Sequence, residues 1–163
     1  MDFRLARAAL VLGLLAPTAA AEPYAVGSEL PALTLEDQHG ESHTLDRSIG
    51  LLLFSRDMDG GRVIQDALAE DGAAFLQAHS AAYVADVSRM PGLVRRMIAK
   101  PRMRKRPYTM WLDEAGEVTA DFPSQDGLPT LLFLEERRIV RIQHPATAKE
   151  LREAVSPASA AQP

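Results

Sequence analysis

Two carboxylates separated by one residue are the side chains of this chain best placed to do chemistry. Asp57 and Asp59 lie in the segment Asp57-Met58-Asp59-Gly60-Gly61, just after the apolar run Leu51–Phe54. A carboxylate can act as a nucleophile, as a general acid or as a ligand for Mg²⁺. The alternative interpretation is structural: Asp59 caps a helix, and the two glycines let the chain turn sharply where that helix begins. We favour the structural interpretation.

Thiol chemistry is excluded, because none of the 163 residues is a cysteine. The thiolate is the nucleophile of disulfide exchange and the group that peroxides oxidise, and no other side chain does this work. Without disulfides, packing alone must stabilise the fold. Ser55, Ser88 and Ser124 also lack the Gly-x-Ser-x-Gly setting of an activated serine. No phosphate-loop or dinucleotide glycine pattern occurs.

A cluster of cations is the most unusual feature of a chain whose formal net charge is −4. We call residues 95–106 the basic segment; its seven cations are Arg95, Arg96, Lys100, Arg102, Arg104, Lys105 and Arg106. Pro101 and Pro107 are expected to hold the segment extended, so that the charges cannot all lie on one helix face. Its functional interpretations are an anionic partner, a phosphate-bearing ligand or the inner-membrane surface. The structural alternative is a solvated loop paired with Glu114, Glu117 and Asp121.

The histidines predict no metal site, and we expect no metal and no cofactor. His39 and His43 are four residues apart, but in a turn and a strand, where this spacing does not bring two ligands together as it would on a helix. His79 and His144 have no acidic or histidine neighbour at ligand spacing. The methionines are better explained as flexible filling of the core than as metal ligands.

The first 21 residues are typical of an export signal. Arg4 and Arg7 precede the apolar run Ala8–Ala16, and Ala19-Ala20-Ala21 supplies small residues for cleavage. The run is too short to span a bilayer, so we expect cleavage near Ala21 and a periplasmic or secreted protein. The alternative is an uncleaved leader that tethers the protein to the membrane.

The rest of the chain is the right length for one domain, which we place at residues 22–156. Residues 157–163 form a small-residue tail that we expect to be disordered. The leader is positively charged, so the domain itself is more acidic than the whole chain. Such a charge gives no general attraction to nucleic acid, and we expect no nucleic-acid partner.

The hydrophobic pattern predicts an α/β fold. Leu51–Phe54 and Tyr83–Val87 are typical of buried central strands. Helical spacing begins at Arg62, with a break at Asp71-Gly72. A second helix follows Pro91, has its own apolar face and is expected to end at Pro101; the residues of that face are Leu93, Val94, Met97 and Ile98.

The C-terminal half predicts paired strands and a closing helix. Tyr108–Leu112 and Val118–Phe122 are expected to form a hairpin, and Leu131–Leu134 and Ile139–Ile142 form two further strands. Thr147, with Glu150 three residues later, is a capping box that opens the last helix.

Four stretches resemble the redoxin branch of the thioredoxin-like superfamily, the alkyl hydroperoxide reductase and thiol-specific antioxidant group. Gly27–Gly40 is similar to the family pattern G-x-x-x-P-x-x-x-L-x-D-x-x-G, and Leu51–Phe54 to the strand that delivers the active-site cysteine. Tyr108–Phe122 is similar to the extra hairpin of the family, and Gly127–Leu134 to the stretch that carries its cis-proline. The four stretches occur in the family's order, and the match covers nearly the whole chain after the leader.

The resemblance implies a thioredoxin-like three-layer sandwich, with a central mixed sheet, helices on both faces and an added β-hairpin. It also implies that the Leu128–Pro129 peptide bond is cis. The departure falls on the chemistry, because Asp59-Gly60-Gly61-Arg62 occupies the place of the family's cysteine motif. The resemblance therefore implies an exported, redox-inactive protein that works by binding a peptide, a protein or a small anionic ligand.

The expected binding groove is carried over from the parent fold, which holds extended substrates beside its active-site loop. In this chain the groove residues are Asp57, Met58, Asp59, Gly60, Gly61, Arg62, Leu128 and Pro129. The basic segment would add an electrostatic contact to such a ligand.

A rival resemblance concerns the same loop. Haloacid dehalogenase-like phosphotransferases place a D-x-D-G motif after a strand, with one Asp as nucleophile and the other as general acid beside Mg²⁺. Asp57 and Asp59 have this spacing, and Ser88 ends a following strand as that family requires. Against this, Ser55 and Arg56 separate the strand from the motif, and no acidic pair closes a late strand. A magnesium-dependent phosphatase-like enzyme is therefore the alternative function.

Overall fold

The computed structural model describes residues 22–156, so the predicted signal peptide and tail lie outside the described residues. The elements in chain order are β1 (Thr34–Asp37), β2 (Ser42–Thr44), β3 (Leu51–Ser55), α1 (Met58–Ala67), α2 (Gly72–Ala78), β4 (Ala81–Asp86), α3 (Gly92–Val94), the π-helix η1 (Arg95–Ala99), α4 (Lys100–Met103), β5 (Trp111–Asp113), β6 (Thr130–Glu135), β7 (Arg138–Gln143) and α5 (Ala148–Val155). No helix among residues 22–156 has the length and apolar character needed to cross a membrane.

Seven strands form one mixed sheet in the order β2-β1-β5-β4-β3-β6-β7. The three central strands β3, β4 and β5 are parallel, whereas β6 and β7 run antiparallel at one edge and the β1–β2 hairpin at the other. Leu53 lies opposite Leu131, and Phe54 lies opposite Thr130. The strand that precedes the Asp57 loop is thus the direct neighbour of the strand that follows Pro129, as the resemblance requires.

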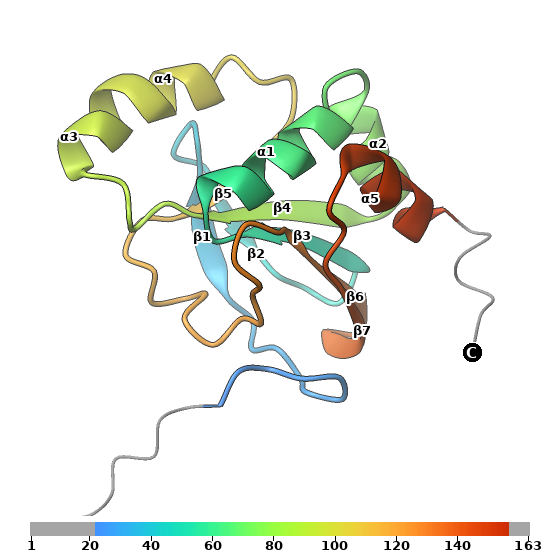
Figure 1. The fold of residues 1–163 in the computed structure, drawn as a ribbon. Helices are drawn as coiled ribbons and strands as arrows, with labels where there is room; N and C mark the ends of the chain where they lie inside the picture. The colour runs from blue at the N-terminus through green and yellow to red at the C-terminus, as the bar shows by residue number, and fades with distance from the viewer. Residues whose placement is uncertain (1–21, 157–163) are drawn as a thin grey trace, which may run out of the picture.

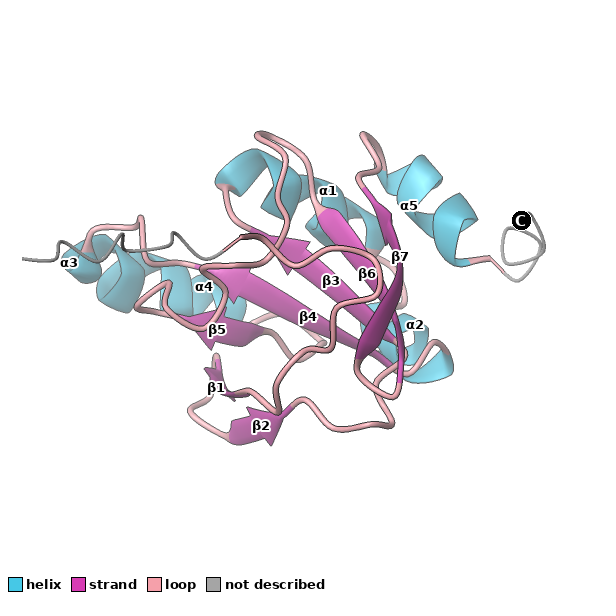
Figure 2. Cartoon of the chain, turned by 90° about the horizontal axis from the view of Figure 1, so that it is seen from below, coloured by secondary structure: helices cyan, strands magenta, loops and turns pink. Residues whose placement is uncertain are grey.

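The helices all lie on one face of the sheet (Figures 1 and 2). On that face Ile64 and Leu68 of α1, Phe75 of α2 and Leu151 of α5 are buried against the strands. They form the larger of two apolar clusters, and their removal from water is the main source of stability in a chain without disulfides.

Extended chain covers the other face, where helices were also expected. A second apolar cluster there packs Phe54 and Leu132 of the sheet against Leu30, Leu45 and Phe122, none of which is helical. The segment 114–128, which could have supplied a helix, contains Gly116 and Gly127 with positive φ as well as Pro123. These residues favour turns, so the third layer is built from loops.

The predicted hairpin at Tyr108–Phe122 is corrected to a single short strand. β5 pairs with β1 and β4, and residues 118–122 form turns. Side chains replace the expected ladder: Asp113 accepts hydrogen bonds from the backbone N–H of Thr119, and Arg56 donates to the carbonyl of Phe122. The backbone groups that a second strand would have used are therefore already satisfied.

The helix after Pro91 also differs from its prediction, because it passes through Pro101. The elements α3, η1 and α4 follow one another without a gap from Gly92 to Met103. In a regular α-helix the Pro101 ring would collide with the carbonyl of Met97. The π-helical turn Arg95–Ala99 widens the helix just before the proline, which lets the chain continue. Residues 95–103 of the basic segment are thus helical rather than extended.

Candidate functional site

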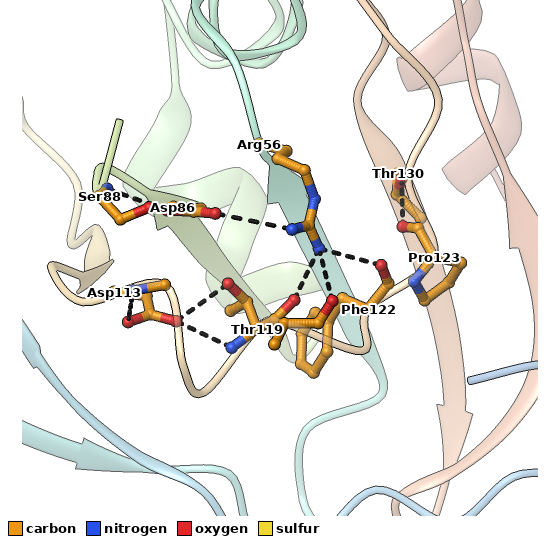
Figure 3. A network of polar contacts seen from close by, with 10 residues as sticks. Arg56, Asp86, Ser88, Asp113, Thr119, Phe122, Pro123 and Thr130 are labelled. Carbon is orange, nitrogen blue, oxygen red and sulfur yellow. Dashed lines mark hydrogen bonds and ion pairs between the residues drawn. The ribbon is translucent and has the colours of Figure 1, made fainter. Parts of the chain in front are cut away.

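A half-buried arginine occupies the corner of the sheet where β3, β4 and β5 end (Figure 3). Arg56 follows β3 directly, and its Nη2 donates to the backbone carbonyls of Thr119 at 2.7 Å, Phe122 at 3.1 Å and Ala120 at 3.3 Å. Its Nη1 lies 3.8 Å from a carboxylate oxygen of Asp86, at the end of β4. The resemblance puts the reactive sulfur of redox members at Asp59–Arg62, in the first turns of α1, so this corner lies a few residues before that place; here a guanidinium holds a loop.

The two carboxylates at this corner are held by hydrogen bonds and an ion pair within the protein. Asp86 Oδ1 accepts from both the backbone N–H and the hydroxyl of Ser88, at 2.9 and 2.6 Å, while its other oxygen faces Arg56. Asp113 accepts from the Gly116 N–H at 2.8 Å and from the N–H and hydroxyl of Thr119 at 2.8 and 3.0 Å. Both side chains are nearly inaccessible to water. This network holds the 114–123 loop in place.

Asp57, rather than Asp59, caps the helix that follows. One carboxylate oxygen of Asp57 accepts from the Gly60 N–H at 2.8 Å, which satisfies a free donor in the first turn of α1. The other oxygen accepts from the Gly127 N–H, also at 2.8 Å. Asp57 therefore ties the start of α1 to the turn before Pro129. Asp59 is exposed and pairs with Arg62 at 3.1 Å.

The structure brings the two sides of the predicted groove into direct contact. A Cβ atom on Gly60 would lie 2.8 Å from the carbonyl carbon of Leu128 and 3.0 Å from the nitrogen of Pro129, so only glycine fits there. Gly60, Gly61 and Pro129 are buried, whereas Met58 and Arg62 are exposed. Two cavities found among residues 22–156 lie elsewhere.

The cis peptide bond at Leu128–Pro129 that the resemblance implied is not found, and this prediction is corrected. No peptide bond between residues 22 and 156 is cis, so Leu128–Pro129 is trans. Gly127 turns the chain with a φ of 74°, and its N–H is held by Asp57. The hydroxyl of Thr130 donates to the carbonyl of Pro123 at 3.0 Å. These contacts align the chain with β6 without a cis bond.

The larger of the two cavities, about 450 Å³, lies beside the end of the basic segment. Arg106, His39 and Trp111 are among the residues that line it. Tyr108 lines it as well, and the hydroxyl of Tyr108 is buried without a hydrogen-bond partner. Burial raises the pKa of this phenol, which therefore stays neutral.

Asp37, Glu41 and His43 are the one group of three donors among residues 22–156 whose ligand atoms lie close enough to share a metal ion. Hydrogen bonds within the group account for its geometry. His43 lies 3.0 Å from one oxygen of Asp37, and the N–H groups of His39 and Glu41 donate to the other. Burial raises the pKa of Asp37, but the hydrogen bonds from His43, Glu41 and His39 outweigh it and hold this pKa below 3.8.

Five of the seven cations in the basic segment are exposed and have no acidic partner among the described residues, and three of these five have no hydrogen-bond partner there either. Arg95 and Lys100 both pair with Glu114, Arg104 donates to the carbonyl of Gln38, and Arg106 donates to Gln65. Glu117 and Asp121, the other acids expected to neutralise the segment, take no part in an ion pair with it. The three unpaired cations are Arg96, Arg102 and Lys105.

No family model and no curated protein matches the chain. Solved structures similar to this chain include a peroxidoxin, BcpB, from Mycobacterium tuberculosis, with a TM-score of 0.57 and 19% identity over 85% of this chain and 98% of that chain. A putative protein disulfide isomerase from Bacteroides thetaiotaomicron matches with a TM-score of 0.55 and 15% identity over 80% of this chain and 86% of that chain. A thio-disulfide isomerase from Thermus thermophilus matches with a TM-score of 0.52 and 19% identity over 81% of this chain and 95% of that chain. The chain therefore has the thioredoxin-like fold of the redoxins, and it has this fold without a cysteine.

Two features of the site escaped prediction from the sequence. The Arg56 network was missed because its partners are backbone carbonyls, which carry no sequence signal; an arginine directly after a buried strand was the available hint. The exposure of the apolar residues beside the basic segment was missed as well, because an amphipathic pattern does not tell which side faces the core.

Proposed function

We propose that this protein is an exported, redox-inactive member of the thioredoxin fold that acts by binding an anionic partner through the basic segment. One observation carries the proposal: Arg96, Arg102 and Lys105 are exposed and unpaired within the described structure of a chain with net charge −4. Like charges held close together repel one another, and a bound anion removes that repulsion. Such a segment attracts an anionic partner despite the overall negative charge.

The corner of the sheet around Arg56 supports binding rather than catalysis. Asp113 accepts hydrogen bonds at both oxygens, Asp86 accepts two at one oxygen and faces Arg56 with the other, and no thiol is available. The groove predicted beside Pro129 is a weaker candidate than the basic segment, because the backbone of Leu128 rests directly on Gly60. A peptide would have to lie over this contact rather than between its two sides.

No observation favours the magnesium-dependent phosphatase. Both oxygens of Asp57 already accept backbone hydrogen bonds, so this side chain is committed to structure. Asp59 is exposed and ion-paired with Arg62, and the described residues offer no third carboxylate or histidine that could complete a metal site with the pair. We therefore keep binding as the single proposed function.

Retention on immobilised heparin, a polyanion without a lipid phase, tests the proposal. We expect the protein to be retained at low salt and to elute as salt rises, because screening weakens contacts between exposed charges. Charge reversal at Arg96, Arg102 and Lys105 to glutamate should abolish retention, and circular dichroism should report an intact fold because all three side chains are exposed.

A matched control variant keeps the net charge equal. Arg47→Glu, Lys149→Glu and Arg138→Glu reverse three exposed cations outside the basic segment, with 69%, 84% and 58% of the side chains accessible. We expect the control to elute close to wild type. Equal retention of both triple variants, or no retention of the wild type, would exclude the basic segment as the binding surface.

A further inference from the structure

We propose that the anionic partner is a lipid bilayer, and that the helical run Gly92–Met103 docks flat on its surface. This inference rests on the proposed function and names its partner. The run consists of α3, η1 and α4 and lies at one end of the molecule, on the helical side of the sheet (Figures 1 and 2).

Four large apolar side chains of this run face water. Leu93 is 72% exposed, Met97 67%, Ile98 48% and Val94 42%, and they make up half of the exposed large apolar residues within residues 22–156. Single exposed apolar residues are ordinary on protein surfaces, but a contiguous group is characteristic of an interaction surface.

Helical spacing gathers these side chains on the outer side of the run. Positions 93, 97 and 101 form one row of residues four apart, and positions 94 and 98 form the adjacent row. Arg95, Ala99 and Met103 form the inward row and are less exposed. Met103 packs on the larger apolar cluster, and Arg95 donates to the carbonyl of Val87 at 3.2 Å, so the run is held from inside with its apolar side outward.

Cations border the apolar side and complement an anionic surface. Arg102 continues the row of Val94 and Ile98, while Arg96 lies on the opposite flank, and Lys105 follows just after the run. No Asp or Glu occurs between Asp86 and Asp113, so nothing acidic within this stretch offsets them.

This combination favours a bilayer over other anionic partners. A soluble polyanion would use the cations but would leave four apolar side chains in water, whereas an apolar protein surface would not need unpaired arginines. At a membrane surface the apolar side chains enter the boundary of the acyl chains and the cations contact the phosphates, as in interfacial amphipathic helices. The bilayer therefore satisfies both halves of the surface at once.

Co-sedimentation with vesicles tests the inference. The protein used is residues 22–163, the form expected after cleavage near Ala21. We expect binding to vesicles of phosphatidylcholine with phosphatidylglycerol and little binding to phosphatidylcholine alone. The charge reversal at Arg96, Arg102 and Lys105 should weaken binding by at least about tenfold. The apolar variant Leu93→Ser with Met97→Ser should also weaken it by roughly tenfold.

The apolar variant separates this inference from the proposed function. Leu93→Ser with Met97→Ser leaves the cations in place, so its retention on heparin should match wild type while its vesicle binding falls. Unchanged vesicle binding by this variant, or a wild type that binds heparin but no vesicle, would overturn the proposal that the partner is a bilayer. Either result would leave the proposed function, binding of an anionic partner, unaffected. Failure on both heparin and vesicles would overturn both proposals. The control variant at Arg47, Arg138 and Lys149 should bind vesicles within about threefold of wild type.

Discussion

Arg56 holds together the corner of the sheet that lies beside the place of the family's cysteine motif. Its guanidinium donates to three carbonyls of a loop that has no regular secondary structure, and it lies beside a carboxylate that is 3% exposed. An arginine presents its donors in a fixed planar arrangement, which suits several acceptors at once. A thioredoxin-like chain without cysteine can therefore keep this corner rigid through hydrogen bonds.

Replacement of Arg56 by methionine should destabilise the protein by about 2–4 kcal/mol, because it leaves buried carbonyls and the Asp86 carboxylate without their partner. Urea unfolding followed by circular dichroism measures this. The control is Arg62→Met, which removes an exposed ion pair on α1 and should change stability by no more than about 0.5 kcal/mol. Similar effects of the two substitutions would show that the network does not hold the loop.

Asp37 should make stability depend on pH at the acid end. The hydrogen bonds hold its pKa in the folded protein below the ordinary value of 3.8, so their contribution is complete about one pH unit above 3.8 and is lost as the pH falls through the lower, folded value. The unfolding free energy of wild type should therefore exceed that of Asp37→Asn by a constant amount down to about pH 5, and the gap should shrink below it. A gap that stays constant into strong acid would contradict the assignment.

At the scale of elements, the sequence was sufficient where local pattern and tertiary packing agree. The apolar run at Leu51–Phe54 predicted β3, Asp71-Gly72 predicted the break between α1 and α2, and Thr147 caps α5 as expected, with its hydroxyl accepting from the Glu150 N–H at 3.2 Å. These signals are carried by residues close together in the chain, so no partner from a distant segment was needed to interpret them.

Distant partners explain the elements that the sequence predicted wrongly. The strand at 118–122 is absent because Arg56, more than sixty residues earlier, takes its carbonyls. The helix at 92–103 was predicted with an apolar face, but its end was placed at Pro101; a π-helical turn carries it further, to Met103. The candidate groove was predicted as a set of neighbours, and Asp57 does contact Gly127, but Gly60 leaves no space between the two sides.

The start of α1 offers a direct comparison of two neighbouring carboxylates. Asp57→Ala should cost about 1–2 kcal/mol, because it removes both the helix cap and the contact with the Gly127 N–H. Asp59→Ala, two residues away and exposed, should change stability by less than about 0.5 kcal/mol. Thermal or urea unfolding of the pair decides whether the carboxylate motif is structural. A larger loss from Asp59→Ala would reverse the assignment.

At the scale of the whole molecule, chemistry and binding are separated in space. The corner of the sheet around Arg56, beside the place of the family's cysteine motif, is closed by buried hydrogen bonds, while the exposed cations and apolar side chains gather at residues 92–106. The predicted leader would deliver this surface to a compartment bounded by membranes. We therefore expect a partner to bind at residues 92–106 and not at the corner around Arg56.

Amide chemical shifts recorded during titration with a heparin oligosaccharide test this separation most directly, because they report every backbone N–H at once. The account predicts shifts that are concentrated at residues 92–106, with Arg96, Arg102 and Lys105 among the most affected, and little change at residues 57–62 and 127–128. Shifts concentrated at Asp57–Arg62 and Leu128, with the helical run unchanged, would contradict it and return the binding site to the corner of the fold.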